Sequence, residues 1–249
     1  MILRPSSPTA RGHDESSGPA ARIWDVIFAS QQRAPEFFVT QADHAHLAGQ
    51  IAQSITAEMF PRFDDEIIHA IWLHDEGWCE LDRAQQRSFI TISPAEFLTA
   101  WRGSIATAEN SSALGGAIVS AHFERLAHVR LQMAKDAGED KLAMENFIAG
   151  ESDRRRRLVR DLSVARLEEL TDVLQFCDVF SLYLCCGASE RVQFPQSFGD
   201  RRFTLTLRDA QYVSDPPLFS REIRLRVPAW AVRREKRKLQ PVAFDFQLR

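Results

Sequence analysis

The sequence predicts a mainly α protein: a helical bundle that carries a small antiparallel β element. From Gln41 to Gly187, apolar residues recur at the three- and four-residue spacing of amphipathic helices. After residue 200 the spacing shortens to the apolar–polar alternation of half-buried strands. With 249 residues, of which 45% are hydrophobic, the chain is long enough to bury a large core without disulfides.

The helical spacing places the expected helices at about 43–59, 64–76, 94–101, 112–137, 141–149 and 163–186. A glycine, which helix C-termini favour, follows four of these segments: Gly77, Gly138, Gly150 and Gly187.

The β element is expected from both ends of the chain. Residues 1–21 form a flexible segment in this interpretation, because Ser, Pro, Gly and charge dominate it. "RIWDVIFA" (22–29) and "EFFVT" (36–40) then predict a hairpin. Near the C-terminus "RFTLTLRD", "REIRLRV" and "VAFDFQLR" predict strands. We expect one domain over 22–249, with 200–249 packed on the helical body as a β appendage.

The overall composition excludes several classes of partner. Residues 1–149 carry 12 basic and 20 acidic side chains and residues 150–249 carry 19 and 14, which falls short of a nucleic-acid-binding signature. No stretch approaches the ~20 apolar residues of a membrane span. The four cysteines include no CxxC pair, and the first residues lack the apolar core of a secretory signal. We expect a cytoplasmic protein that is either a monomer or a homo-oligomer.

The stretch "IWLHDEGW" (71–78) joins an apolar run to a histidine and a carboxylate. His74 and Asp75 come at the inner end of an apolar helix, where burial of a charge is costly. A helix C-terminus carries partial negative charge, so a cation nearby would be favourable. The pair is therefore a candidate for holding a metal where the helix ends.

Helical phase identifies three further inward polar residues. His44 shares a face with Leu47 and Ile51. His122 shares one with Ile118 and Val119, whereas His46, His69 and His128 fall on other faces. Asp178 lies on an apolar face within "LTDVLQFCDVFSLYLCC".

Imidazole together with carboxylate suits a divalent metal, here Mn, Fe, Zn, Ni, Co or Mg. Each inward histidine alone is more commonly a hydrogen-bonded core residue than a ligand. A lone inward aspartate is more commonly a hydrogen-bonded carboxylate or the partner of an arginine. The metal prediction rests on the occurrence of several such residues together.

The order of His44, the His74–Asp75 doublet and a distant Asp178 resembles the HD superfamily of metal-dependent phosphohydrolases. The segments "VTQADHAHLAGQIA", "AIWLHDEGW", "VSAHF" and "DVFSLYLCCG" are more closely similar to the uncharacterised bacterial family called domain of unknown function 3891. The superfamily resemblance implies an HD-like bundle in which those four residues bind one metal. It also implies that His122 binds a second metal or a substrate phosphate.

The resemblance implies hydrolysis of a small, possibly nucleotide-like phosphate ester, with Asp75 or Asp82 as general base. Two alternatives stay open: a di-iron oxygenase of HD type, and a non-catalytic ligand-binding or regulatory protein with a structural metal. The arginine run 154–157 is a candidate phosphate contact, although charge runs usually form a solvated face. Trp78 can stack on a substrate ring or pack over the helix end.

Overall fold

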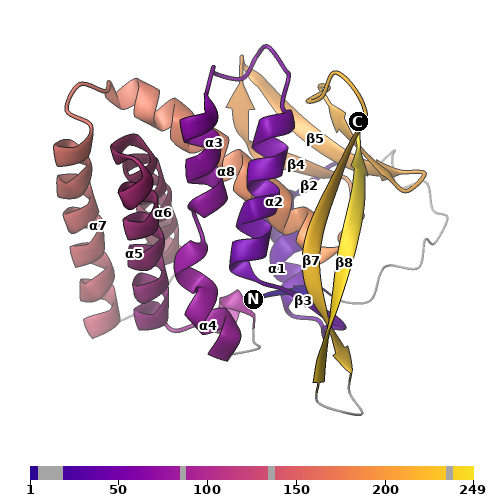
Figure 1. Ribbon diagram of the computed structural model, residues 1–249, viewed down its shortest axis with the longest axis horizontal. Helices are drawn as coiled ribbons and strands as arrows, with labels where there is room; N and C mark the ends of the chain where they lie inside the picture. Colours follow the sequence, from indigo (N-terminus) through magenta and orange to yellow (C-terminus); the bar gives the residue numbers. More distant parts are fainter. Residues whose placement is uncertain (5–18, 85–87, 134–137, 234–237) are drawn as a thin grey trace.

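A mixed β-sheet and a set of helices packed beside it make up the molecule, as the computed structural model shows (Figure 1). The structure describes residues 1–4, 19–84, 88–133, 138–233 and 238–249. Among these, the sheet has eight strands in the order β1-β3-β7-β8-β6-β5-β4-β2. In Figure 1 the long β7–β8 ribbon and the helices α5, α6 and α7 lie on opposite sides of the molecule.

The strands are short except for β7 and β8. Their bounds are Ile2–Arg4 (β1), Ala21–Arg22 (β2), Phe37–Val39 (β3), Val192–Phe198 (β4), Arg201–Arg208 (β5), Gln211–Asp215 (β6), Ile223–Arg233 (β7) and Lys238–Leu248 (β8). Two pairings are parallel, β2 with β4 and β6 with β8, and the others are antiparallel.

The six expected helices are present with different ends, and helices α1 and α4 and the 3₁₀ turns η2 and η3 were not expected. Their bounds are Ile23–Gln31 (α1), Gln41–Ser54 (α2), Asp65–Leu73 (α3), Glu76–Trp78 (η2, a 3₁₀ turn), Cys79–Ala84 (α4), Phe89–Thr91 (η3), Pro94–Ser111 (α5), Ala113–Met133 (α6), Glu139–Leu158 (α7) and Val164–Cys186 (α8). None of the helices within the described ranges is both long and apolar enough to cross a membrane.

The expectation of a mainly α, HD-like bundle with a small antiparallel β element is wrong. The chain has an α/β fold, because strands from its two ends join one mixed sheet. At one edge β3 pairs with β7, and at the other β2 pairs with β4. The C-terminal strands share one apolar core with the helices. Local periodicity could not reveal these pairings between residues far apart in sequence.

The N-terminal region differs from its prediction at two places. Residues 2–4 of the expected flexible segment form β1, and Ile2 is fully buried, while 5–18 lie outside the described residues. The expected strand at 22–29 is helix α1, with Ile23 and Ile27 buried one turn apart. The second half of the expected hairpin, at 36–40, does contain strand β3.

Helix α8 runs through the centre of the molecule. From Leu170 to Cys186 most of its side chains are buried, as expected for a helix covered on all sides. Ser163 caps its first turn by accepting a hydrogen bond from the Arg166 N–H. At its other end the buried Arg4 guanidinium donates to the carbonyl of Leu184 at 2.7 Å. Strand β1 thus fixes the helix that carries Asp178.

Gly77 allows the segment after the His–Asp doublet to lie directly against α5. A Cβ at Gly77 would overlap backbone atoms of Ala100 and Ser104, and a Cβ at Gly103 would come within 3.1 Å of the Gly77 Cα. The Gly77 N–H donates to Ser104 Oγ at 3.0 Å. The role of this glycine is therefore close packing of backbones rather than a left-handed helix cap.

Gly150 was expected to end a helix, and this prediction is wrong. Helix α7 continues through it to Leu158, and a Cβ at this position would meet no atom within 4 Å.

We predict that Gly77→Ala lowers the free energy of unfolding by about 3 kcal/mol or more, because the added methyl group has no space between two backbones. The matched control is Gly150→Ala, which should leave stability unchanged or raise it by about 0.5–1 kcal/mol. Urea unfolding followed by circular dichroism measures both. Equal small effects would show that η2 and α5 are not in close contact.

Candidate metal centre

Five buried polar side chains from separate parts of the chain converge at the centre of the molecule. His44 lies one turn inside α2, which begins at the capping residue Thr40. His74 and Asp75 occupy the link between α3 and η2. His122 belongs to α6 and Asp178 to α8. All five are at most 7% exposed, which confirms the inward orientation predicted from helical phase.

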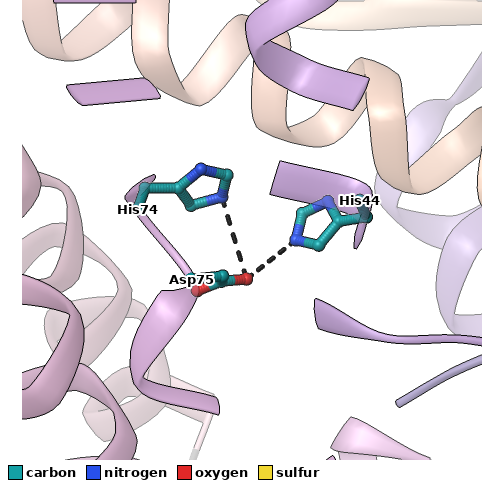
Figure 2. A group of neighbouring side chains, drawn as sticks. All are labelled: His44, His74 and Asp75. Atoms are coloured by element: carbon teal, nitrogen blue, oxygen red, sulfur yellow. Dashed lines mark hydrogen bonds and ion pairs between the residues drawn. The ribbon is translucent and has the colours of Figure 1, made fainter. Parts of the chain in front are cut away.

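Asp75 lies between two imidazole rings (Figure 2). Its Oδ2 atom is 2.7 Å from His44 Nε2 and 3.7 Å from His74 Nε2. Asp178 approaches the same nitrogens from α8, with Oδ1 at 3.9 Å from His44 Nε2 and 3.5 Å from His74 Nε2. Three of these side chains, His44, His74 and Asp75, offer ligand atoms within 4.8 Å of one another.

The second oxygen of Asp178 faces a further histidine. Asp178 Oδ2 is 3.8 Å from His122 Nε2, and the two residues form a second group with His74. The structure therefore brings together all five predicted ligands, and it does so in two groups that share His74.

The hydrogen bonds of His74 fix its tautomer. Its Nδ1 lies 2.6 Å from the carbonyl oxygen of Ile71, which can only accept, so Nδ1 carries the proton. Neutral His74 then presents the lone pair of Nε2 to the two carboxylates. This fully buried nitrogen has no hydrogen-bond partner in the described part of the chain, since its nearest carboxylate oxygens lie at the long distances given above.

A similar argument applies to His44. Ser181 Oγ donates to the Asp178 carbonyl at 2.8 Å, so its oxygen accepts from His44 Nδ1, also at 2.8 Å. The Nε2 lone pair of neutral His44 therefore faces Asp75 Oδ2. Two electron-rich atoms at that separation repel each other unless a proton or a metal cation neutralises them.

The pKa values of His74 and Asp178 show that this centre favours positive charge. Burial opposes the charged form of His74, but the carboxylates of Asp75 and Asp178 outweigh burial and raise its pKa to about 9. Burial likewise opposes ionisation of Asp178, but attraction to the neighbouring imidazoles, first His74 and then His122, outweighs burial and lowers that pKa. Without a metal, the centre therefore holds a proton at neutral pH.

His122 behaves differently. Burial lowers its pKa to about 4, against the attraction of Asp178, so the ring is neutral at pH 7. Its Nδ1 has no partner among the described residues. A neutral imidazole at this position can ligate a cation or donate one hydrogen bond.

The centre opens into a cavity of about 790 Å³. His44, Asp75, His122 and Asp178 line it, whereas His74 does not. Much of the remaining wall is aromatic, and three arginines also contribute: Arg22, Arg125 and Arg130. A ligand in the cavity can reach the carboxylates and two of the histidines, while His74 is enclosed by protein.

The residues present fit a divalent transition metal. His44 and His74 aim lone pairs at one region, and Asp75 and Asp178 supply negative charge there. Each ring also donates its other N–H to a protein oxygen, which is how ligating histidines are usually oriented. Because the set is rich in imidazole, it favours ions such as Zn, Fe, Co or Ni over Mg, which prefers oxygen ligands.

Asp82, predicted as a possible general base, lies outside this centre. Its Oδ1 pairs with the amino group of Met1 at 2.8 Å, and its Oδ2 accepts from the Gln41 N–H at 2.5 Å. Asp82 is buried and does not line the cavity. One oxygen holds the start of α2 and the other holds the amino group of Met1, so the geometry gives Asp82 no part in proton transfer.

The arginine run 154–157 also lies apart from the cavity lining. Arg154 pairs with Glu109 at 2.6 Å, and Arg155 pairs with Glu124 and donates to Ser120 Oγ at 3.0 Å. These contacts tie α7 to α5 and α6, which is a structural role.

Trp78 lines the cavity and is only 2% exposed. Its ring packs edge-on against Phe97, with centroids 5.2 Å apart, which matches packing over the helix end.

Several cavity residues were not identified in the sequence, among them two aromatic residues of α1. Trp24 and Phe28 line the cavity from α1, which was predicted as a strand. The signal was present as two pairs at a spacing of four, Trp24 with Phe28 and Ile23 with Ile27. The β-branched and aromatic composition of "RIWDVIFA" concealed it.

The comparisons with known proteins give a family and no activity. A family model described as "Protein of unknown function (DUF3891)" matches residues 27–234. The chain belongs to this family. The match spans all five residues of the centre and confirms the closer of the two resemblances seen in the sequence. No curated protein and no solved structure matches the chain, and nothing in the comparisons supports the resemblance to the HD superfamily.

We predict that His44→Ala abolishes stoichiometric metal binding, because it removes a buried ligand and its lone pair. His46→Ala is the matched control: His46 lies two residues further along α2 and contacts Glu76 instead. Elemental analysis of both purified variants measures the metal content. Equal metal loss from the two would contradict the proposed ligand set.

We predict that metal affinity rises about tenfold per pH unit from pH 6 to 8. The pKa of His74 is raised to about 9, so below that pH a bound proton must leave before the metal can bind. Calorimetric titration with Co²⁺ at several pH values measures this slope. An affinity that does not change with pH would show that the metal and the His74 proton do not compete.

Proposed function

We propose that the protein is a metal-dependent hydrolase of a small phosphate ester, with its reaction centre at the His–Asp cluster. The observation that carries this proposal is a four-residue ligand set, His44, His74, Asp75 and Asp178, that borders a cavity of about 790 Å³. Catalytic metals need a coordination position open to substrate, and the cavity provides the access. The order of the ligands along the chain, which resembles the HD superfamily, suggests the class of reaction.

Each side chain of the centre has a separate role in the proposed reaction. His44 and His74 would hold the cation from one side through their Nε2 atoms, with rings kept in place by Ser181 and the Ile71 carbonyl. Asp75 and Asp178 would complete the set with negative charge. A divalent cation bound there would lower the pKa of a bound water and neutralise a phosphoryl oxygen.

Asp75 is the better candidate for general base, since it lines the cavity and Asp82 does not. A carboxylate has two oxygens, so one can hold the cation while the other accepts a proton from water. His122 is neutral at pH 7 and lines the same cavity, so it can donate a hydrogen bond to a substrate oxygen. Arg125, three residues along α6, also lines the cavity and adds positive charge, although it pairs with Asp172 at 2.6 Å.

The di-iron oxygenase is less well supported by this geometry. One Nε2 lone pair binds one cation, so His74 cannot serve both groups. A second metal beside Asp178 Oδ2 would then have His122 as its one further ligand among the groups described above. A purely structural metal is also less well supported, because structural sites are closed and this cluster borders a cavity.

We place the activity in the cytoplasm. The four cysteines are free, and three of them are buried. A reducing compartment would keep them so.

The test of the proposed function is a screen of small phosphate esters with protein that retains the metal with which it was purified. We expect turnover of at least one ester, and its loss on treatment with a chelator. Metal-loaded protein that hydrolyses no ester, contains two irons and consumes oxygen would instead favour the oxygenase.

We predict that His122→Ala keeps the metal and lowers kcat by roughly 100-fold, the effect of losing one transition-state hydrogen bond. His128→Ala is the control on the same helix, since His128 is exposed and does not line the cavity. Metal content and kcat are measured on the same preparations. If His122→Ala lowers the metal stoichiometry from two to one, His122 is a ligand of a second metal.

A further inference from the structure

Three aromatic rings form one wall of the cavity. They come from elements that carry none of the candidate metal ligands. Trp24 and Phe28 of α1 are stacked, with centroids 5.7 Å apart and an interplanar angle of 27°. Phe89 of η3 continues the row, 6.5 Å from Phe28 and tilted by 46°. All three residues line the cavity, and α1 and η3 supply none of the five candidate ligands.

These three rings are only partly covered by the rest of the protein. Trp24, Phe28 and Phe89 are each only half-buried, whereas Ile23 and Ile27 on the neighbouring face of α1 are almost completely buried. Trp24 and Phe89 pack partly against the core, whereas Phe28 is not among the described residues that do so, and all three rings remain partly open toward the cavity. Partly exposed apolar side chains that lie side by side commonly mark a binding surface.

Other parts of the wall are apolar as well. Val129 of α6 lines the cavity and is 48% exposed, one of few large apolar residues left so open in the described chain. Phe97 and Trp101 of α5 line the cavity too, and their ring centroids are 5.3 Å apart. The cavity thus combines a group of imidazoles and carboxylates with walls that are largely apolar and rich in aromatic rings.

We propose that the row of Trp24, Phe28 and Phe89 binds a planar aromatic group of the substrate, which makes the substrate an aryl-bearing phosphate ester. The inference rests on the proposed function, because the phosphate end is assigned to the metal centre.

The cavity volume and its walls both favour such a ligand. A volume of about 790 Å³ is in the range of sites for drug-sized ligands and much larger than a short alkyl phosphate requires. Ring faces interact with other rings by offset stacking or edge contacts, beyond the effect of apolar area alone. A saturated group of equal size would gain only the free energy of burying its apolar surface, without the additional interaction between ring faces.

The test uses two uncharged probes, 2-naphthylmethanol and its decahydro analogue. They are added to the full chain, which retains the metal with which it was purified. The probes share one carbon skeleton and one hydroxyl group, but only the first is planar and aromatic. Neither has a phosphate to hydrolyse, so binding is measured independently of turnover. Calorimetry should show about tenfold tighter binding of the aromatic probe.

Substitutions at Phe28 locate the binding surface. Phe28→Leu keeps an apolar side chain and should weaken binding of the aromatic probe about fivefold to tenfold, while leaving the decahydro probe unchanged. The matched control is Phe37→Ala. Phe37 is also a half-buried phenylalanine in an aromatic pair, 5.1 Å from Phe244, but it lies outside the cavity lining, so both affinities should stay unchanged.

Equal affinities for the two probes, or no effect of Phe28→Leu, would overturn the aromatic-group inference. Failure of the proposed function gives a different result: the aromatic probe binds at Phe28, but no phosphate ester is turned over. If 1-naphthyl phosphate and butyl phosphate are hydrolysed with equal kcat/KM, the proposed function stands and this inference fails.

Discussion

The approach of Asp75 and Asp178 to the same pair of histidine nitrogens is the constraint on which the rest of the structure depends. Two carboxylates at most 7% exposed are costly to bury unless positive charge compensates them. Both neighbouring rings, His44 and His74, have their Nδ1–H groups bonded elsewhere, so the neutral form of each ring presents only a lone pair to the carboxylates. A cation, or a proton held by His74 in its place, is what makes this arrangement favourable.

The fold surrounds this centre with elements that cannot easily shift. Arg4 of the N-terminal strand β1 donates a hydrogen bond to the end of α8, the helix that carries Asp178. Gly77 lets the segment just after Asp75 lie against α5 without a side chain between them. Asp82 holds the start of α2, the helix that carries His44. Contacts outside the metal centre thus fix the distances between the side chains within it.

The sequence was a better guide to the site than to the fold. Helical phase and the burial of polar residues identified the five central side chains, because each departs from the apolar pattern of its own helix. The sheet was underestimated because its short N-terminal strands β2 and β3 pair with strands from the other end of the chain. Helix α1 was misread because its composition favours a strand while its spacing of four favours a helix. Asp82 illustrates the remaining limit: a carboxylate near the motif in sequence can face away from it in space.

The central claim is that a single transition metal binds where the four ligands meet. Anomalous diffraction from crystals of the purified protein tests it most directly, because it locates the element as well as identifying it. The account predicts a peak at about 2.0–2.3 Å from His44 Nε2, His74 Nε2 and an oxygen of each aspartate. A metal bound elsewhere, or a metal-free centre in which His44 and Asp75 remain in direct contact in crystals soaked with Zn²⁺ or Co²⁺, would contradict it.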